Sequence, residues 1–148
     1  MDFGILLGQA YQTFVRELHA ELAARGHEVL GASYGFVFRA LAEKPLTASQ
    51  LGEQLGITAQ GAAKVVDEMV RAGYVERRPD PADKRAKLLH LSERGNEFLG
   101  AVRAFHADYE RRLIERAGPE QVAALRAALG GIVSEAPDPG GQRDFRPL

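Results

Sequence analysis

LTASQLGEQLGITAQGAAKVVDEMVRAGYVERRPDPADKRAKLLHL, residues 46–91, is the stretch that decides the fold of this 148-residue chain. Thr47, followed three residues later by Gln50, has the pattern of a capping box at the start of a short helix. A glycine ends that helix, and Thr58 then caps a second helix that Gly73 terminates. Two helices joined by a tight turn in this way are typical of a helix-turn-helix.

The hydrophobic period changes after the second helix. Residues 74–77 and 87–91 have the pattern of two short strands. Residues 78–86 between them contain two prolines and two aspartates, which is typical of a hairpin loop. A hairpin that follows a helix-turn-helix predicts a winged helix-turn-helix.

The second helix has a buried face of alanine, valine and methionine, which fixes the residues that point outward. Gln60, Gly61 and Lys64 lie on the outer face, with Thr58 at its start and Ile57 packed inward before it. Such a helix fits the major groove of double-stranded DNA, where Gln60 can bond adenine and Lys64 guanine. We expect Thr58 to hold a phosphate and Gly61 to let the DNA approach closely.

Basic residues also gather in the hairpin. They are Arg77, Arg78, Lys84, Arg85 and Lys87. We expect Arg77, Lys84 and Arg85 to contact DNA, with Arg85 in a narrow minor groove. Asp83 is expected to orient a wing arginine through a charge-assisted hydrogen bond.

Charge and composition are compatible with this interpretation without proving it. The net charge of the chain is −1, but residues 58–90 hold 7 basic and 5 acidic residues, a net charge of +2. The chain has no cysteine, which excludes disulfides, thiolate zinc sites and cysteine nucleophiles. Because no long apolar run or signal peptide is recognisable, we expect a cytoplasmic protein without a membrane span.

Helices are also predicted outside the winged unit, over residues 2–25, 33–43, 92–117 and 120–134. The first and last of them carry apolar stripes that a small domain covers poorly, which favours a homodimer. We therefore expect a mainly α fold with a small β-hairpin wing. Its parts would be dimerisation helices (1–30 and 92–135), a winged helix-turn-helix DNA-binding domain (31–91) and a flexible tail (136–148).

Four segments together resemble the MarR family of bacterial transcriptional regulators. They are LGEQLGIT (51–58), VDEMVRAGYVER (66–77), DPADKRA (80–86) and LHLSERG (89–95). The resemblance implies an obligate homodimer with intertwined first and last helices. It also implies binding to a pseudo-palindromic operator, usually as a repressor, and often release by a small-molecule effector.

The resemblance also implies roles for individual residues. By motif position, Arg85 matches the family's minor-groove arginine and Asp83 its orienting aspartate, while Thr58, Gln60, Gly61 and Lys64 fall on positions of the recognition helix. Many members have a larger residue where Gly61 stands, so the family's base preference does not transfer. The lack of cysteine excludes the peroxide-sensing branch.

Aromatic residues outside the winged unit are candidates for lining an effector cavity between the two layers, although each is also a plausible core residue. They are Tyr11, Phe14, Phe36, Phe105 and Tyr109. His106 and Glu110 have the spacing of a metal-ligand pair but lack a second pair, so no metal or cofactor is expected. His27 and His90 are expected in loops or facing solvent.

Two alternative functions remain open from the sequence. A winged-helix module can bind another protein instead of DNA, and a regulator can activate, since polarity depends on where its site lies relative to a promoter. An enzyme is not expected, because no glycine-rich phosphate loop, Ser-His-Asp set or carboxylate pair stands out.

Overall fold

Side-chain caps and glycines set the helix ends of the winged unit. The computed structural model describes residues 1–27 and 34–135. Thr47 Oγ1 accepts the backbone N–H of Gln50, and the Gln50 side chain accepts that of Thr47, which completes the predicted capping box of α3 (Ala48–Leu55). Gly56 ends α3 at φ 66°, a left-handed conformation that suits glycine. Thr58 caps α4 (Ala59–Arg71) as predicted.

The hairpin consists of β1 (Val75–Pro79) and β2 (Lys87–Leu91), paired antiparallel with Val75 opposite Leu91. β1 begins one residue later and ends two residues later than the sequence predicts, since Arg78 and Pro79 belong to the strand and not to the loop. A proline is tolerated at this end of the ladder because it needs no N–H there. Leu46, ahead of α3, adds an isolated bridge to Leu89 that was not predicted.

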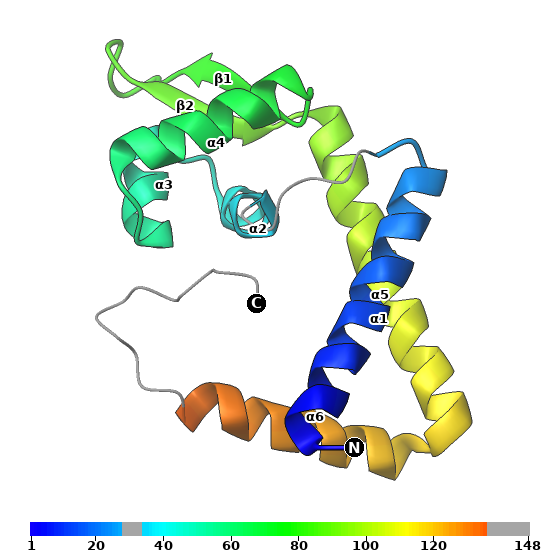
Figure 1. Cartoon of the computed structure of the whole chain (residues 1–148). Helices are drawn as coiled ribbons and strands as arrows, with labels where there is room; N and C mark the ends of the chain where they lie inside the picture. Colours follow the sequence, from blue (N-terminus) through cyan, green and yellow to red (C-terminus); the bar gives the residue numbers. More distant parts are fainter. Residues whose placement is uncertain (28–33, 136–148) are drawn as a thin grey trace.

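The remaining helices are α1 (Phe3–Ala24), α2 (Tyr34–Glu43), α5 (Glu93–Ala117) and α6 (Pro119–Glu135). In Figure 1, α1 and α5 lie side by side, α6 crosses near the start of α1, and α2, α3, α4 and the hairpin form a separate group at the far end of α5. The predicted mainly α fold with a β-hairpin wing is thus confirmed. The predicted flexible tail, 136–148, lies outside the described residues.

One core joins the winged unit to the start of α5. Its most deeply buried side chains, each less than 2% exposed, are Val37, Phe38, Leu51, Val66, Met69, Tyr74 and Leu89. The rings of Phe38 and Phe98 stack at 4.4 Å and extend this core onto α5. Burial of one face of α4 leaves its other face to solvent. The prediction that Ile57 packs inward was wrong: the residue is 38% exposed, because it lies in the turn between α3 and α4.

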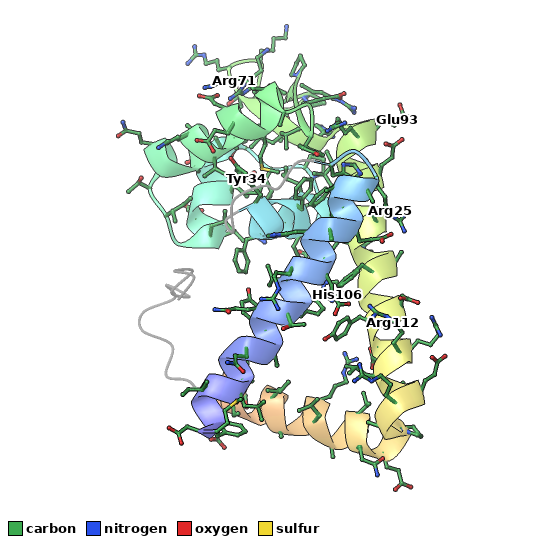
Figure 2. All side chains as sticks on the ribbon, turned by 45° about the vertical axis from the view of Figure 1, so that its right-hand side comes forward. Arg25, Tyr34, Arg71, Glu93, His106 and Arg112 are labelled. Atoms are coloured by element: carbon green, nitrogen blue, oxygen red, sulfur yellow. The ribbon has the colours of Figure 1, made fainter. Side chains whose placement is uncertain are left out.

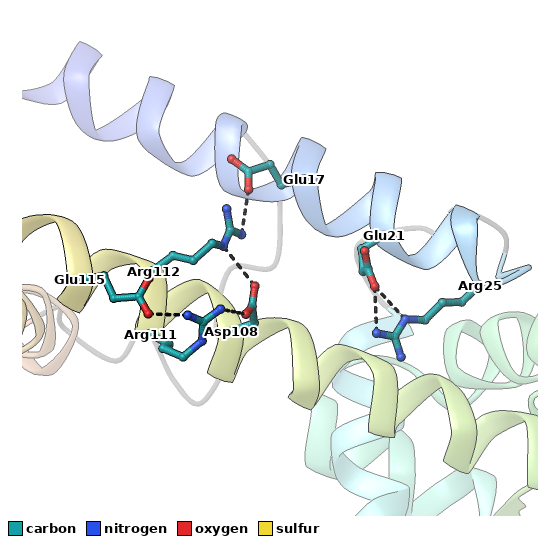
Figure 3. Close-up of polar contacts among 7 residues, drawn as sticks. All are labelled: Glu17, Glu21, Arg25, Asp108, Arg111, Arg112 and Glu115. Carbon is teal, nitrogen blue, oxygen red and sulfur yellow. Dashed lines mark hydrogen bonds and ion pairs between the residues drawn. The ribbon is translucent and has the colours of Figure 1, made fainter.

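Ion pairs and aromatic contacts join the long helices. Arg112 of α5 donates to Glu17 of α1 at 3.0 Å and to Asp108 one turn earlier, and Figure 3 shows Arg111 between Asp108 and Glu115. The hydrogen bond from Arg111 lowers the pKa of the Asp108 carboxyl. Because these charges are exposed or only half-buried, they contribute little to stability individually. No helix in the described part of the chain is long and apolar enough to cross a membrane.

Candidate nucleic-acid interface

The outer face of α4 is exposed over most of its length. A shallow open depression runs along it, lined by Thr58, Gln60, Gly61, Ala63, Lys64, Asp67, Glu68 and Arg71. The structure therefore brings together Thr58, Gln60, Gly61 and Lys64 on one face, and Arg71 lies further along the same face. Arg71 lies at the end of the molecule that carries the hairpin, while His106 and Arg112 lie along the long helices (Figure 2). We call α4 and the β1–β2 hairpin the reading head.

The start of α4 is built around its cap. Thr58 Oγ1 accepts the N–H of Gly61 at 3.0 Å, which leaves the hydroxyl proton of Thr58 available to a phosphate. A Cβ atom at position 61 would lie 3.2 Å from this oxygen. A side chain there would need a small shift of the cap, and Gln50 holds the same position relative to its cap Thr47, so the cap by itself does not require glycine at position 61.

Two acidic residues on α4 are held by other elements. Asp67 forms an ion pair with Arg77 of β1. The Glu68 carboxylate accepts a hydrogen bond from the hydroxyl of Tyr34 at the start of α2. This hydrogen bond raises the pKa of Tyr34 to about 12. The sequence does not predict these two pairs, since nothing in the local pattern shows which partner a carboxylate on the outer face of a helix finds.

These contacts leave the reading head with an excess of unpaired positive charge. Lys64 and Arg71 on α4, and Lys84 and Arg85 in the hairpin, are exposed and have no side-chain partner among the residues the structure describes. Arg77 differs, because its guanidinium lies against Asp67 at the base of the hairpin. The free cations are therefore spread over both parts of the reading head.

The hairpin tip is shaped by two aspartates. Asp80 accepts the backbone N–H of Ala82, and Asp83 accepts that of Arg85, each at 2.9 Å. The predicted bond from Asp83 to a wing guanidinium is absent here, because its carboxylate is turned to the backbone two residues on, as in an Asx turn. Asp83 thus fixes the backbone from which Arg85 projects.

The predicted effector-lining residues are only partly brought together. Phe14 of α1 packs edge-on against Phe105 and Tyr109 of α5, at 5.4 and 4.9 Å between ring centroids. Tyr11 is 66% exposed elsewhere on α1, and Phe36 packs against the core from α2. His106 lies beside Phe14, and its burial and the charge of Arg39 lower its pKa.

A helix-turn-helix followed by a basic two-stranded hairpin defines a winged helix-turn-helix protein. The family model for the MarR family matches residues 32–86. An uncharacterized HTH-type transcriptional regulator of Bacillus subtilis, YkoM, is 31% identical over 93 residues, which span 62% of this chain and 60% of that protein. Over residues 32–86 the chain is thus similar to the MarR family.

Solved structures show the same fold. The YusO protein of Bacillus subtilis superposes with a TM-score of 0.70 at 18% identity, over 91% of this chain and 94% of that one. A mutant of MepR from S. aureus, bound to an oligodeoxyribonucleotide, superposes with a TM-score of 0.62 at 16% identity, over 90% of this chain and 97% of that one. At these identities the likeness extends to the fold alone.

Proposed function

We propose that this chain is a DNA-binding transcriptional regulator that binds a pseudo-palindromic operator as a homodimer and represses transcription. The observation that carries the proposal is the set of unpaired cations on the reading head, Lys64, Arg71, Lys84 and Arg85. The names of its relatives, and the DNA in the structure of a mutant MepR, support the same class of function. Neither the names of the relatives nor that structure points to an enzymatic activity.

In the proposed complex, α4 enters the major groove with Gln60 and Lys64 toward the base edges. Thr58 and Arg71 hold phosphates at the two ends of the helix, and Arg85 enters the neighbouring minor groove. Arg77 contributes through its pair with Asp67, which ties the hairpin to α4. A bound dimer competes with RNA polymerase, and an effector releases it only by binding the released form more tightly than the DNA-bound form.

The dimer is supported by apolar side chains that the isolated chain leaves in solvent. On α1 these are Phe3, Ile5, Leu6 and Leu7, and on α6 they are Leu125, Leu129, Ile132 and Val133. α6 crosses near the start of α1, so the two sets lie at the same end of the molecule, away from the reading head (Figure 1). A second copy of this chain, packed against the first, would bury these apolar side chains.

Selection of bound duplexes from a random DNA pool tests the proposed function. We expect a palindromic sequence with half-sites about 10 base pairs apart, the spacing that two recognition helices read. Three cations in each protomer, Arg71, Lys84 and Arg85, lie against the DNA backbone or in the minor groove and displace counterions, about six per dimer. Binding should then weaken by about a thousandfold between roughly 50 and 200 mM salt. A protein-interaction module would instead enrich no sequence and show no such salt dependence.

Replacement of Leu6 by glutamate tests the dimer. A charge placed in the proposed interface would lose its hydration on association, so we expect Leu6→Glu to be monomeric at concentrations where the wild type is dimeric. Light scattering measures the molecular masses of the wild type and of Leu6→Glu. Glu53→Lys, on the exposed side of α3, changes charge away from the patch and should leave the mass unchanged. A wild-type protein that stays monomeric at high micromolar concentration would argue against the homodimer.

A further inference from the structure

His27, directly after α1, is buried and not solvent-facing. Only 7% of its surface is exposed, and its ring packs against the rings of Tyr74 and Phe98, at 5.9 and 5.3 Å between centroids. Its Nδ1 atom lies 3.2 Å from the hydroxyl oxygen of Tyr74. No local pattern indicates this contact, since 47 positions separate the two residues.

Arg94, in the first turn of α5, completes the cluster. Its guanidinium donates to the Tyr74 hydroxyl at 3.1 Å and to the carbonyl of Gly26 at 3.2 Å, and it lies over the Tyr74 ring at 4.7 Å from the centroid. The cluster therefore joins the end of α1, the start of α5 and the turn between α4 and β1. We call His27, Tyr74 and Arg94 the α1–wing joint.

The hydrogen-bonding capacities of the three side chains favour a neutral His27. A guanidinium only donates, so the hydroxyl oxygen of Tyr74 accepts from Arg94. Tyr74 is fully buried, and Nδ1 of His27 is an acceptor within reach of its hydroxyl proton. The hydroxyl of Tyr74 both accepts and donates when Nδ1 carries no proton. The joint has more hydrogen-bond donors than acceptors, because the buried N–H at Nε of Arg94 finds no acceptor in the described residues.

Charged groups on two elements face the imidazole of His27: Arg94 and Glu97 on α5, and Arg25 at the end of α1. Tyr74, in the turn between α4 and β1, adds a neutral polar group. Burial lowers the pKa of His27 below its ordinary value of 6.5, Arg94 and Arg25 lower it further, and Glu97 opposes them. Folding thus favours the neutral form of His27. The contribution of neutral His27 to the free energy of unfolding is complete above pH 6.5, and it is lost as the pH falls from 6.5 through the lowered pKa.

Tyr74 links the joint to both parts of the reading head. Its backbone N–H bonds to Met69 in the last turn of α4, and it directly precedes β1. We propose that neutral His27 is a positioning residue for DNA binding, which acts through Tyr74 to hold the reading head against α1, and that its protonation releases this hold. This inference rests on the proposed function. In a dimer, loosening both joints would alter the spacing of the two recognition helices.

The sign of the pH effect separates this proposal from simple electrostatics. Protonation of histidines adds positive charge and by itself strengthens binding to DNA. We expect the opposite for the wild type: at fixed ionic strength, its affinity for the selected duplex should fall about fivefold or more from pH 7.5 to pH 5.5. Fluorescence anisotropy of a labelled duplex measures this affinity at each pH.

The decisive variant is His27→Asn. The asparagine amide oxygen takes the place of Nδ1 as an acceptor but does not titrate, so this variant should bind like the wild type at pH 7.5 and keep its affinity at pH 5.5. His90→Asn and His106→Asn are the matched controls and should retain the wild-type fall. Parallel pH profiles of the wild type and His27→Asn, or loss of the fall in a control variant, would overturn the proposal.

A titration of the imidazole signals by NMR tests the joint without DNA. His27 should titrate below pH 6.5, and Tyr74→Phe should raise its pKa because the donor to Nδ1 is removed. Titration of His27 at 6.5 or above would overturn the proposal. Failure of any duplex to bind at pH 7.5 would instead count against the proposed function, so the two failures are distinguishable.

Discussion

Replacement of Arg85 by alanine is expected to weaken binding of the selected duplex by about thirtyfold or more. Arg85 is exposed at the hairpin tip and has no side-chain partner in the described residues. An arginine contact to DNA is worth about 1–3 kcal/mol, and a dimer loses two of them. Binding isotherms give the change, and light scattering should show that the mass is unaltered.

Arg78→Ala is the matched control for Arg85→Ala. It removes the same charge from the same hairpin, but the guanidinium of Arg78 is already paired with Glu76 at 2.9 Å. We expect a loss of affinity of less than about threefold, as for a rim charge that is partly neutralised. Equal losses in both variants would mean that the hairpin acts through net charge and not through a minor-groove arginine.

Gly95→Ala is expected to destabilise the fold by about 3 kcal/mol or more, the upper range for overpacking against a rigid neighbour. A Cβ atom at this position would lie 2.2 Å from the carbonyl oxygen of Tyr74. The first turn of α5 would have to move away from the reading head. The hydrogen bonds from the Ser92 backbone and hydroxyl to Tyr74 and Gly73 would then be lost.

Gly100→Ala provides the comparison on the same helix. No atom lies within 4 Å of a Cβ built there, so the change should be neutral or stabilise by up to about 1 kcal/mol through the better helix propensity of alanine. Urea denaturation of both variants at one protein concentration measures the difference. A Gly95→Ala protein as stable as the wild type would show that α5 and Tyr74 are not in fixed contact.

The fold was largely predictable because its signals are local. Thr47, Thr58 and Gly73 act on backbone groups within a few positions of themselves, and the predicted caps and helix end appear where they were expected. The outer face of α4 was predictable for a related reason: a buried stripe with helical period defines the opposite face. The register of the hairpin was less predictable, because the ladder extends to Pro79.

The partners within the candidate site were not predictable in the same way. Asp83 was expected to hold a guanidinium and instead holds the backbone N–H of Arg85. The pair between Arg77 and Asp67 was not expected, while the predicted DNA contact of Arg77 stays a prediction. Both outcomes depend on which of several nearby groups a flexible charged side chain reaches, and sequence spacing does not decide that.

Residues 46–91 by themselves determined two capped helices, a glycine turn and a basic hairpin, and with them the class of protein. Only the tertiary structure decided how this unit is joined to the long helices. Gly95 is required by a carbonyl group 21 positions earlier in the chain, and His27 meets Tyr74 across 47 positions. Caps and periodicity act over one or two helical turns, whereas these contacts exist only once separate elements have packed together.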